Sequence, residues 1–256
     1  MVNLTNGQWS SLYNMFSFGL ISMLACTVYT LVSQSRVLPK YRSALVLSSM
    51  VTFIAAYHYF RIFNSFNESS MKGAVMVGTS QGSFNEAYRY VDWILTVPLL
   101  LVEVIAVLGL AKAAASSMIG RLVPASAAMI ALGYPGEISN VNSTKIIFGV
   151  LSTIPFLYIL YVLFVELGKS LDRQPEGVAA TVGRLRLLLI ATWGVYPISY
   201  LLPIINKTTE ANAAGSFVGR QIGYTIADVL AKCVFGLTIY KIAKMKSVAE
   251  GMKDDH

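Results

Sequence analysis

Charged residues are scarce in this 256-residue chain, and their scarcity excludes an ordinary soluble domain. They make up 13% of the sequence and hydrophobic residues 55%, whereas a typical soluble domain is about a quarter charged. Too few charges remain to cover a water-exposed surface. The mean hydropathy of +0.60 instead indicates an integral membrane protein.

Cysteine is also rare, which excludes a disulfide scaffold. The only two, Cys26 and Cys233, lie within apolar stretches and are expected to pack as small hydrophobic groups. The 19 glycines and 8 prolines are too few for a collagen-like chain, and the aromatic residues argue against disorder. The first residues, MVNLTNGQW, carry no basic residue, so the first apolar stretch is expected to be retained rather than cleaved.

Seven long apolar runs are present instead, each long enough to cross a bilayer as a helix. They lie near residues 10–33, 41–63, 85–109, 115–133, 144–168, 181–205 and 216–243. The runs are continuous rather than alternating, which favours helices over a β-barrel. The connections are too short to hold a second domain. The sequence therefore predicts one all-α domain over residues 1–256, a bundle of seven transmembrane helices.

The net charge of +7 does not indicate nucleic-acid binding, because the basic residues fall in short loops between the runs. One side of the expected bundle carries thirteen of them: Arg36, Lys40, Arg42, Lys112, Arg121, Lys169, Arg173, Arg184, Arg186, Lys241, Lys244, Lys246 and Lys253. The other side carries four: Lys72, Lys145, Lys207 and Arg220. Since basic loops stay in the cytoplasm, the N-terminus is expected outside and the C-terminus inside.

The third run, RYVDWILTVPLLLVE, holds three ionisable residues at membrane depth, where each needs a partner or a function. Asp92 and Glu103 are eleven residues apart, which places them on one helix face about 16 Å apart along the axis. Thr96 lies near the same face. Arg89, one turn before Asp92, is expected to pair with it, and that pair alone could simply fix helix packing. Glu103 has no basic residue nearby on its helix, so a neutral acid is expected there.

The seventh run contains IADVLAKCVFG, in which Asp228 and Lys232 lie one helical turn apart. One interpretation is a salt bridge inside the bundle. The other is that the lysine amine, in an apolar pocket, forms a Schiff base with a carbonyl compound. Asp92 and Asp228 would then be its counter-ions.

Aromatic residues of the sixth run, TWGVYPISYLLP, form one stripe: Trp193, Tyr196 and Tyr200. Pro197 is expected to kink this helix. Such a stripe is common in a core, but together with Trp93 it offers flat walls for a long conjugated ligand. His58 of the second run is either a core histidine or, if it faces Asp92, a modulator of that carboxyl group.

Together these motifs resemble the microbial, or type 1, rhodopsins, which are seven-helix retinal proteins. The likeness covers nearly the whole chain and is carried by RYVDWxLTVPLLLVE, WGxYPxxY and DxxxK. It implies a central pocket with all-trans retinal covalently bound at Lys232, Asp92 as proton acceptor and Asp228 as second counter-ion. It also implies a polar network of Arg89, Tyr57, Tyr196 and Asp228. The residues that would line the chromophore are Trp93, Thr96, Leu100, Trp193, Tyr196, Pro197 and Tyr200.

The triplet of Asp92, Thr96 and Glu103 is similar to that of the proteorhodopsin-like and xanthorhodopsin-like proton pumps, in which the glutamate returns a proton to the Schiff base. His58 matches the histidine that such pumps pair with the acceptor, and Leu100 matches a colour-tuning position typical of green absorption. Gly149 stands where bacteriorhodopsin has a bulky tryptophan. In xanthorhodopsin-like pumps a glycine there opens a window for a carotenoid antenna, although a small residue can equally serve close helix packing.

The resemblance therefore implies not an enzyme but a light-driven outward proton pump, a multi-pass protein of a bacterial plasma membrane that contacts lipid, binds no metal or nucleic acid, and assembles as a trimer or pentamer. Two alternatives stay open. One is a photosensory rhodopsin that signals to a partner protein, and the other is a retinal-free transporter that uses Asp228 with Lys232. The proton-release group is left open too, since Glu210 is the only acid in the sixth loop.

Overall fold

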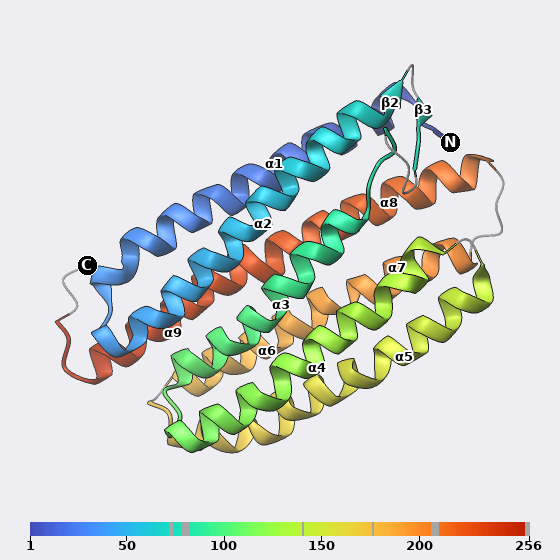
Figure 1. Ribbon diagram of the computed structural model, residues 1–256. Coiled ribbons are helices and arrows are strands. Elements are labelled where there is room, and N and C mark those ends of the chain that lie inside the picture. The colour runs from blue at the N-terminus through green and yellow to red at the C-terminus, as the bar shows by residue number, and fades with distance from the viewer. Residues whose placement is uncertain (72–73, 78–81, 140, 176, 206–209, 254–256) are drawn as a thin grey trace.

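The computed structural model describes residues 1–71, 74–77, 82–139, 141–175, 177–205 and 210–253. Within these ranges, seven helical stretches are long and apolar enough to cross a membrane, and they form one bundle (Figure 1). The predicted all-α, seven-helix architecture is confirmed. Lys72, Lys207 and the side chain of Glu210 lie outside the described residues.

The first four stretches are regular helices: α1 (Asn6–Val32), α2 (Arg42–Ser69), α3 (Ala87–Leu108) and α4 (Lys112–Ile138). Two 3-10 turns, η1 (Ser33–Arg36) and η2 (Pro39–Tyr41), join α1 to α2. The turn from α3 to α4 is tight because Gly109 adopts the left-handed conformation, with φ of 60°, which costs glycine little. Short turns of this kind force neighbouring helices to run antiparallel.

The last three stretches are interrupted. The fifth is α5 (Asn142–Tyr161), followed by the π-helical η3 (Val162–Glu166) and the 3-10 helix η4 (Gly168–Arg173). The sixth is α6 (Val178–Trp193) and α7 (Val195–Ile205). They break at Gly194, just before Pro197, which lacks the N–H that a continuous helix would need. The seventh is α8 (Glu210–Asp228), the π-helical η5 (Val229–Val234) and α9 (Phe235–Ala249).

Helices consecutive in the chain pack against each other, and the last stretch returns to the first. Thus α8 and α9 both contact α1, and α9 also packs on α2 and α6. The bundle is therefore a closed ring of helices with an interior. On α3 that interior face is polar at both ends, because Arg89, Asp92, Thr96 and Glu103 are all buried.

The outward faces are apolar, as lipid requires. On α5 large hydrophobic side chains are exposed along its whole length, among them Ile147, Val150, Ile154, Leu157 and Tyr161. In a water-soluble bundle these positions would carry polar residues.

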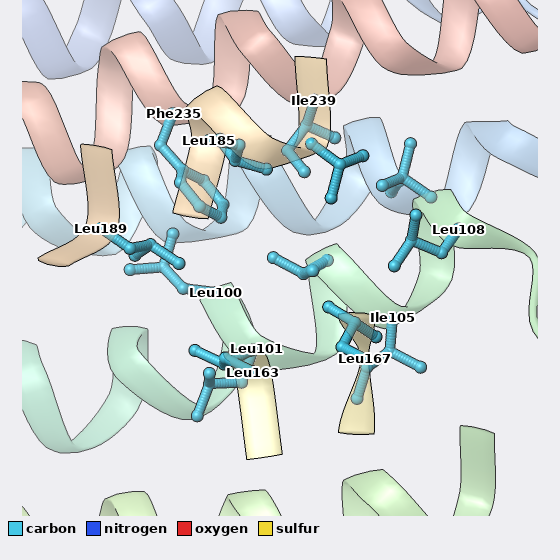
Figure 2. Close-up of a cluster of buried hydrophobic side chains, with 14 of the residues drawn as sticks. Leu100, Leu101, Ile105, Leu108, Leu163, Leu167, Leu185, Leu189, Phe235 and Ile239 are labelled. Carbon is cyan, nitrogen blue, oxygen red and sulfur yellow. The ribbon is translucent and has the colours of Figure 1, made fainter. Parts of the chain in front are cut away.

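A dry apolar cluster fills one half of the bundle. Figure 2 shows side chains of α3, η3, α6 and α9, together with Leu167 just after η3, converging there, with Leu100 and Leu189 on one side of the view and Ile105 and Leu108 on the other. Leu101, Leu163, Leu185, Phe235 and Ile239 are 1% exposed or less. This cluster surrounds the half of α3 that carries Glu103 and separates its C-terminal end from the rest of the interior.

The opposite end carries a small antiparallel sheet of β1 (Val2–Asn3), β3 (Ala74–Val75) and β2 (Ser70–Met71), with β3 in the middle. Below it, Phe16, Phe66, Phe84 and Phe217 form a buried aromatic cluster. The N-terminus lies at this end (Figure 1). The sequence analysis did not predict this sheet.

Close contact between α1 and α2 depends on Gly19, and we expect Gly19→Ala to destabilise the protein. A Cβ there would lie 2.5 Å from Cε1 of Tyr59, a fully buried ring, and 3.1 Å from Cγ2 of Thr225. Overpacking of this kind costs about 1–3 kcal/mol, so the thermal unfolding midpoint in lipid nanodiscs should fall. Gly120→Ala is the control, because nothing lies within 4 Å of that position. Equal midpoints for the two variants would contradict this account of the contact.

Candidate functional site

The interior centres on a buried lysine between two carboxyl groups. Lys232 lies in the π-helical segment η5, and its Nζ is 2.6 Å from Oδ1 of Asp228 and 3.0 Å from Oδ2 of Asp92. All three side chains are at most 2% exposed. An ammonium buried this deeply is tolerable only because carboxylates compensate it.

Both carboxylate oxygens of Asp228 accept hydrogen bonds from several donors. Its Oδ1 accepts from Lys232, from the hydroxyl of Tyr196 at 2.8 Å and from Nε1 of Trp93 at 3.1 Å. Its Oδ2 accepts from the hydroxyl of Tyr59 at 2.8 Å and from a guanidinium nitrogen of Arg89 at 3.4 Å. These donors favour the charged carboxylate over the neutral acid.

Asp92 has far fewer donors. Oδ1 accepts no hydrogen bond from any described residue, and Nδ1 of His58 lies 3.9 Å from it. That nitrogen lies 2.9 Å from the carbonyl oxygen of Ile54. The hydroxyl of Thr96 donates to the backbone carbonyl of Asp92 rather than to its carboxyl group. Of the two carboxylates beside Lys232, Asp92 is therefore the one with an oxygen free to take a proton.

The structure corrects two sequence predictions. Arg89 does not pair with Asp92; its long side chain reaches across to α8 and contacts Asp228 instead. Tyr57 does not join the polar network, because it is 53% exposed. Tyr59 takes that place. Two residues along a helix turn the side chain by about 200°, so the two tyrosines point to opposite faces of α2.

Arg89 also connects this centre to a second polar cluster that the sequence analysis missed. Its Nε and one terminal nitrogen donate to Oε1 of Gln221, at 3.2 and 3.0 Å. Gln221 in turn donates to Glu86 at 2.8 Å. Arg220, the residue just before Gln221 on α8, pairs with Glu86 and with Glu137 of α4. The sequence shows only that Glu86, Glu137 and Arg220 lie near the ends of three apolar runs. That pattern does not by itself predict that the three side chains meet.

Glu103 stands apart from both clusters. Its side chain is fully buried, and neither carboxyl oxygen has a hydrogen-bond partner among the described residues. It lies about 16 Å along α3 from Asp92. A carboxylate without partners in an apolar interior is costly, so the neutral acid is the form this site accommodates.

A cavity of about 870 Å³, its open mouth included, ends at Lys232. Every residue predicted to contact a chromophore lies on its wall except Thr96: Trp93, Leu100, Gly149, Trp193, Tyr196, Pro197, Tyr200 and Lys232. The lining is mostly aromatic and apolar, with Lys232 as its charged group and the hydroxyl residues Ser152 and Thr153 on α5. The size and lining fit a long apolar ligand with one reactive end, and a retinal with its aldehyde carbon at Lys232 meets this description.

Gly149 lies at the wall where this cavity meets α5. A Cβ there would come 3.1 Å from Cε1 of Tyr200, whose hydroxyl donates to the backbone carbonyl of Lys145 at 2.7 Å. Its neighbours on the same helix, Ile146 and Val150, are more than half exposed. The absence of a side chain at Gly149 thus leaves the cavity wall thin on the lipid-facing side.

Comparison with known proteins agrees with this arrangement. A solved structure of xanthorhodopsin, described as a light-driven ion pump with dual chromophore, has 46% identity and a TM-score of 0.89, covering 99% of this chain and 100% of that one. A thermophilic rhodopsin has 41% identity and a TM-score of 0.90, covering 98% and 100%. The green-light absorbing proteorhodopsin of a gamma-proteobacterium, EBAC31A08, is 30% identical over 238 residues, which cover 92% of this chain and 88% of that protein.

The family described as "Bacteriorhodopsin-like protein" matches residues 11–245, which include every helix that contributes to the site. The buried lysine, its two carboxylates and the aromatic cavity thus occur in a chain that belongs to the bacteriorhodopsin-like family.

Proposed function

We propose that this protein is a light-driven outward proton pump with all-trans retinal bound at Lys232. The observation that carries the proposal is the position of Lys232 in the wall of an aromatic cavity, between Asp92 and Asp228. When bound as a Schiff base to this lysine, retinal supplies absorption of visible light and a change of shape that redirects the proton on Nζ. Similarity to proteorhodopsin and xanthorhodopsin supports the same function.

The two carboxylates have different roles in this proposal. Asp228 stays charged, because its oxygens already accept hydrogen bonds from tyrosine, tryptophan, arginine and lysine donors. Asp92 accepts the proton from Nζ of Lys232, 3.0 Å away, since its Oδ1 has no competing donor among the described residues. His58, 3.9 Å from that oxygen, adjusts how tightly Asp92 holds the proton.

Glu103 returns a proton to Lys232 from the other side. As a buried neutral acid it has a proton to give, and the apolar cluster of Figure 2 keeps water from supplying one directly. Asp92 contacts Nζ of Lys232, whereas Glu103 lies about 16 Å from Asp92 along α3, so a proton that enters from Glu103 and leaves through Asp92 moves in one direction. With the N-terminus outside, as the basic loops predict, that direction is out of the cell across a bacterial plasma membrane.

Gly149 is proposed as the contact point of a carotenoid antenna. A flat conjugated ring lying on the lipid-facing wall here would approach the cavity without an intervening side chain. The likeness to a pump with dual chromophore supports this use of the site.

Asp92→Asn should abolish pumping, because the amide cannot take the proton from Lys232. The measurement is the external pH of an unbuffered suspension of illuminated cells that express the chain and are supplied with retinal. Wild-type cells should acidify the medium, and a protonophore should cancel the effect. Glu166→Gln, which removes a carboxylate paired with Arg121 far from the site, should pump normally. Coloured wild-type cells without any pH change would favour a photosensor, and colourless cells a retinal-free transporter.

Glu103→Gln should leave the colour nearly unchanged and slow the return of the proton to Lys232. Losing a positioned acid typically costs ~100-fold or more in a proton-transfer step. Flash photolysis of the purified protein in nanodiscs follows this step directly, with Glu166→Gln as control. A photocycle that decays at the wild-type rate in Glu103→Gln would rule out Glu103 as the donor.

Gly149→Trp should close the proposed antenna site while keeping retinal bound. We expect the action spectrum of acidification in carotenoid-loaded cells to include carotenoid bands in the wild type and to lose them in the variant. Gly120→Trp is the control, because it adds the same side chain at an open position on α4. Equal carotenoid contributions in all three proteins would contradict the antenna.

A further inference from the structure

A second ion cluster lies between α3, α4 and α8, near the end of the bundle that carries the β-strands (Figure 1). Arg220 donates to Glu137 at 3.0 Å and to Glu86 at 2.6 Å through different guanidinium nitrogens. Both carboxyl groups contact the same guanidinium group, which brings them near each other. The side chain of Glu137 is 2% exposed, while those of Glu86 and Arg220 are 12% and 13% exposed. The cluster is thus buried on the Glu137 side and reaches the surface through Glu86.

An unbroken series of hydrogen bonds joins this cluster to Lys232. Asp228 accepts from Lys232 and from Arg89. Arg89 donates to Gln221, and Gln221 donates to Glu86. A change of charge at the lysine is therefore felt at the cluster through polar groups rather than across apolar side chains.

The two clusters differ in charge balance. Around Lys232, two carboxylates meet two cations, because Arg89 shares Asp228 with the lysine. Around Arg220, two carboxylates meet a single cation. Arg89 also acts on Glu86, but it is already paired with Asp228. Among the described residues, the other titratable side chains that face the second cluster are three tyrosines, neutral in their ordinary state: Tyr90, Tyr200 and Tyr224.

Two ionised carboxylates would leave one negative charge uncompensated in a buried site, which is costly. One shared proton removes that cost, as it does in other carboxyl pairs at close range. Nε of Arg220 is also buried without a partner among the described residues, so the guanidinium has no further carboxylate to neutralise.

We propose that Glu86 and Glu137 share a proton around Arg220, and that this pair releases the pumped proton to the outside. The inference rests on the proposed function. The sequence did not identify the proton-release group, because Glu210 is the only acid in the sixth loop. The Glu86–Glu137 pair is proposed to be that group.

The charge balance also says when release occurs. Once Glu103 has returned a proton to Lys232 while Asp92 still holds the first one, the inner cluster has two cations and one carboxylate. Its excess positive charge acts through Arg89 and Gln221 on the outer pair and favours loss of the shared proton there. Asp92 then gives up its proton, which refills the pair. Release therefore precedes deprotonation of Asp92.

The first test is made in the dark. Infrared spectra of the full chain in nanodiscs, recorded during a pH titration, should contain a carbonyl band from the shared proton. Glu137→Gln should remove the band, and Glu166→Gln, which breaks a partly buried two-bond pair with Arg121, should retain it. An unchanged band in Glu137→Gln would overturn the shared proton without touching the pumping assignment.

The second test compares the time courses of two signals after a flash. One is a pH-sensitive dye in the medium, and the other is the infrared band of protonated Asp92. In the wild type the dye should report release before the Asp92 band decays. In Glu137→Gln the two signals should coincide, because Asp92 then discharges directly. Coincident signals in the wild type would overturn the proposal.

Glu86→Gln provides a second variant if Glu137→Gln folds poorly, and it should behave in the same way. Early release that persists in both variants would also overturn the proposal. Failure of the pump itself is separate, because it would appear as absent light-driven acidification in wild-type cells.

Discussion

The burial of one ammonium group constrains how the helices of this bundle are placed relative to one another. Lys232 is 2% exposed, and a charge this far from water costs several kcal/mol unless partners compensate it. Asp92 and Asp228 provide that compensation, and Asp228 in turn is held by Tyr59, Tyr196, Trp93 and Arg89. Four of the seven spans thus supply groups to one charge, and the position of each span is tied to the others through it.

The same demand explains the asymmetry of the interior. Polar groups are concentrated from Lys232 toward the end with the β-strands, where Arg89, Gln221 and the Glu86–Arg220–Glu137 cluster satisfy each other. The other half is mostly leucines, isoleucines and Phe235 around Glu103. Its buried polar groups form separate contacts, such as the hydroxyl pairs between α1 and α2 and the bond from Lys246 to the carbonyl of Leu108. Among the described residues, a linked network of charged groups extends from Lys232 toward one end only, and it gives protons a ready route on that side.

Hydropathy was sufficient to predict the seven spans, because a bilayer demands continuous apolar length. The spacing of Asp228 and Lys232, one turn apart, was enough to place them in contact. The assignment of Tyr57, which was taken from the family resemblance, was wrong, and the sequence could not correct it. In lipid the outward face of α2 is as apolar as the inward one, so periodicity does not tell whether Tyr57 or Tyr59 faces the interior. The pairing of Arg89 with Asp228 and the outer cluster both depend on helices distant in sequence, which no local pattern records.

The apolar cluster around Leu101, Leu163 and Phe235 has an electrical consequence. A membrane potential falls mainly across regions of low polarizability, and each charge moved through 100 mV costs about 2.3 kcal/mol. In the proposed pump the dry half that holds Glu103 acts as the insulating layer, while the polar half behaves more like a conductor. Most of the work against the cell's voltage is then done between Glu103 and Lys232, so an energised membrane slows that step more than any other.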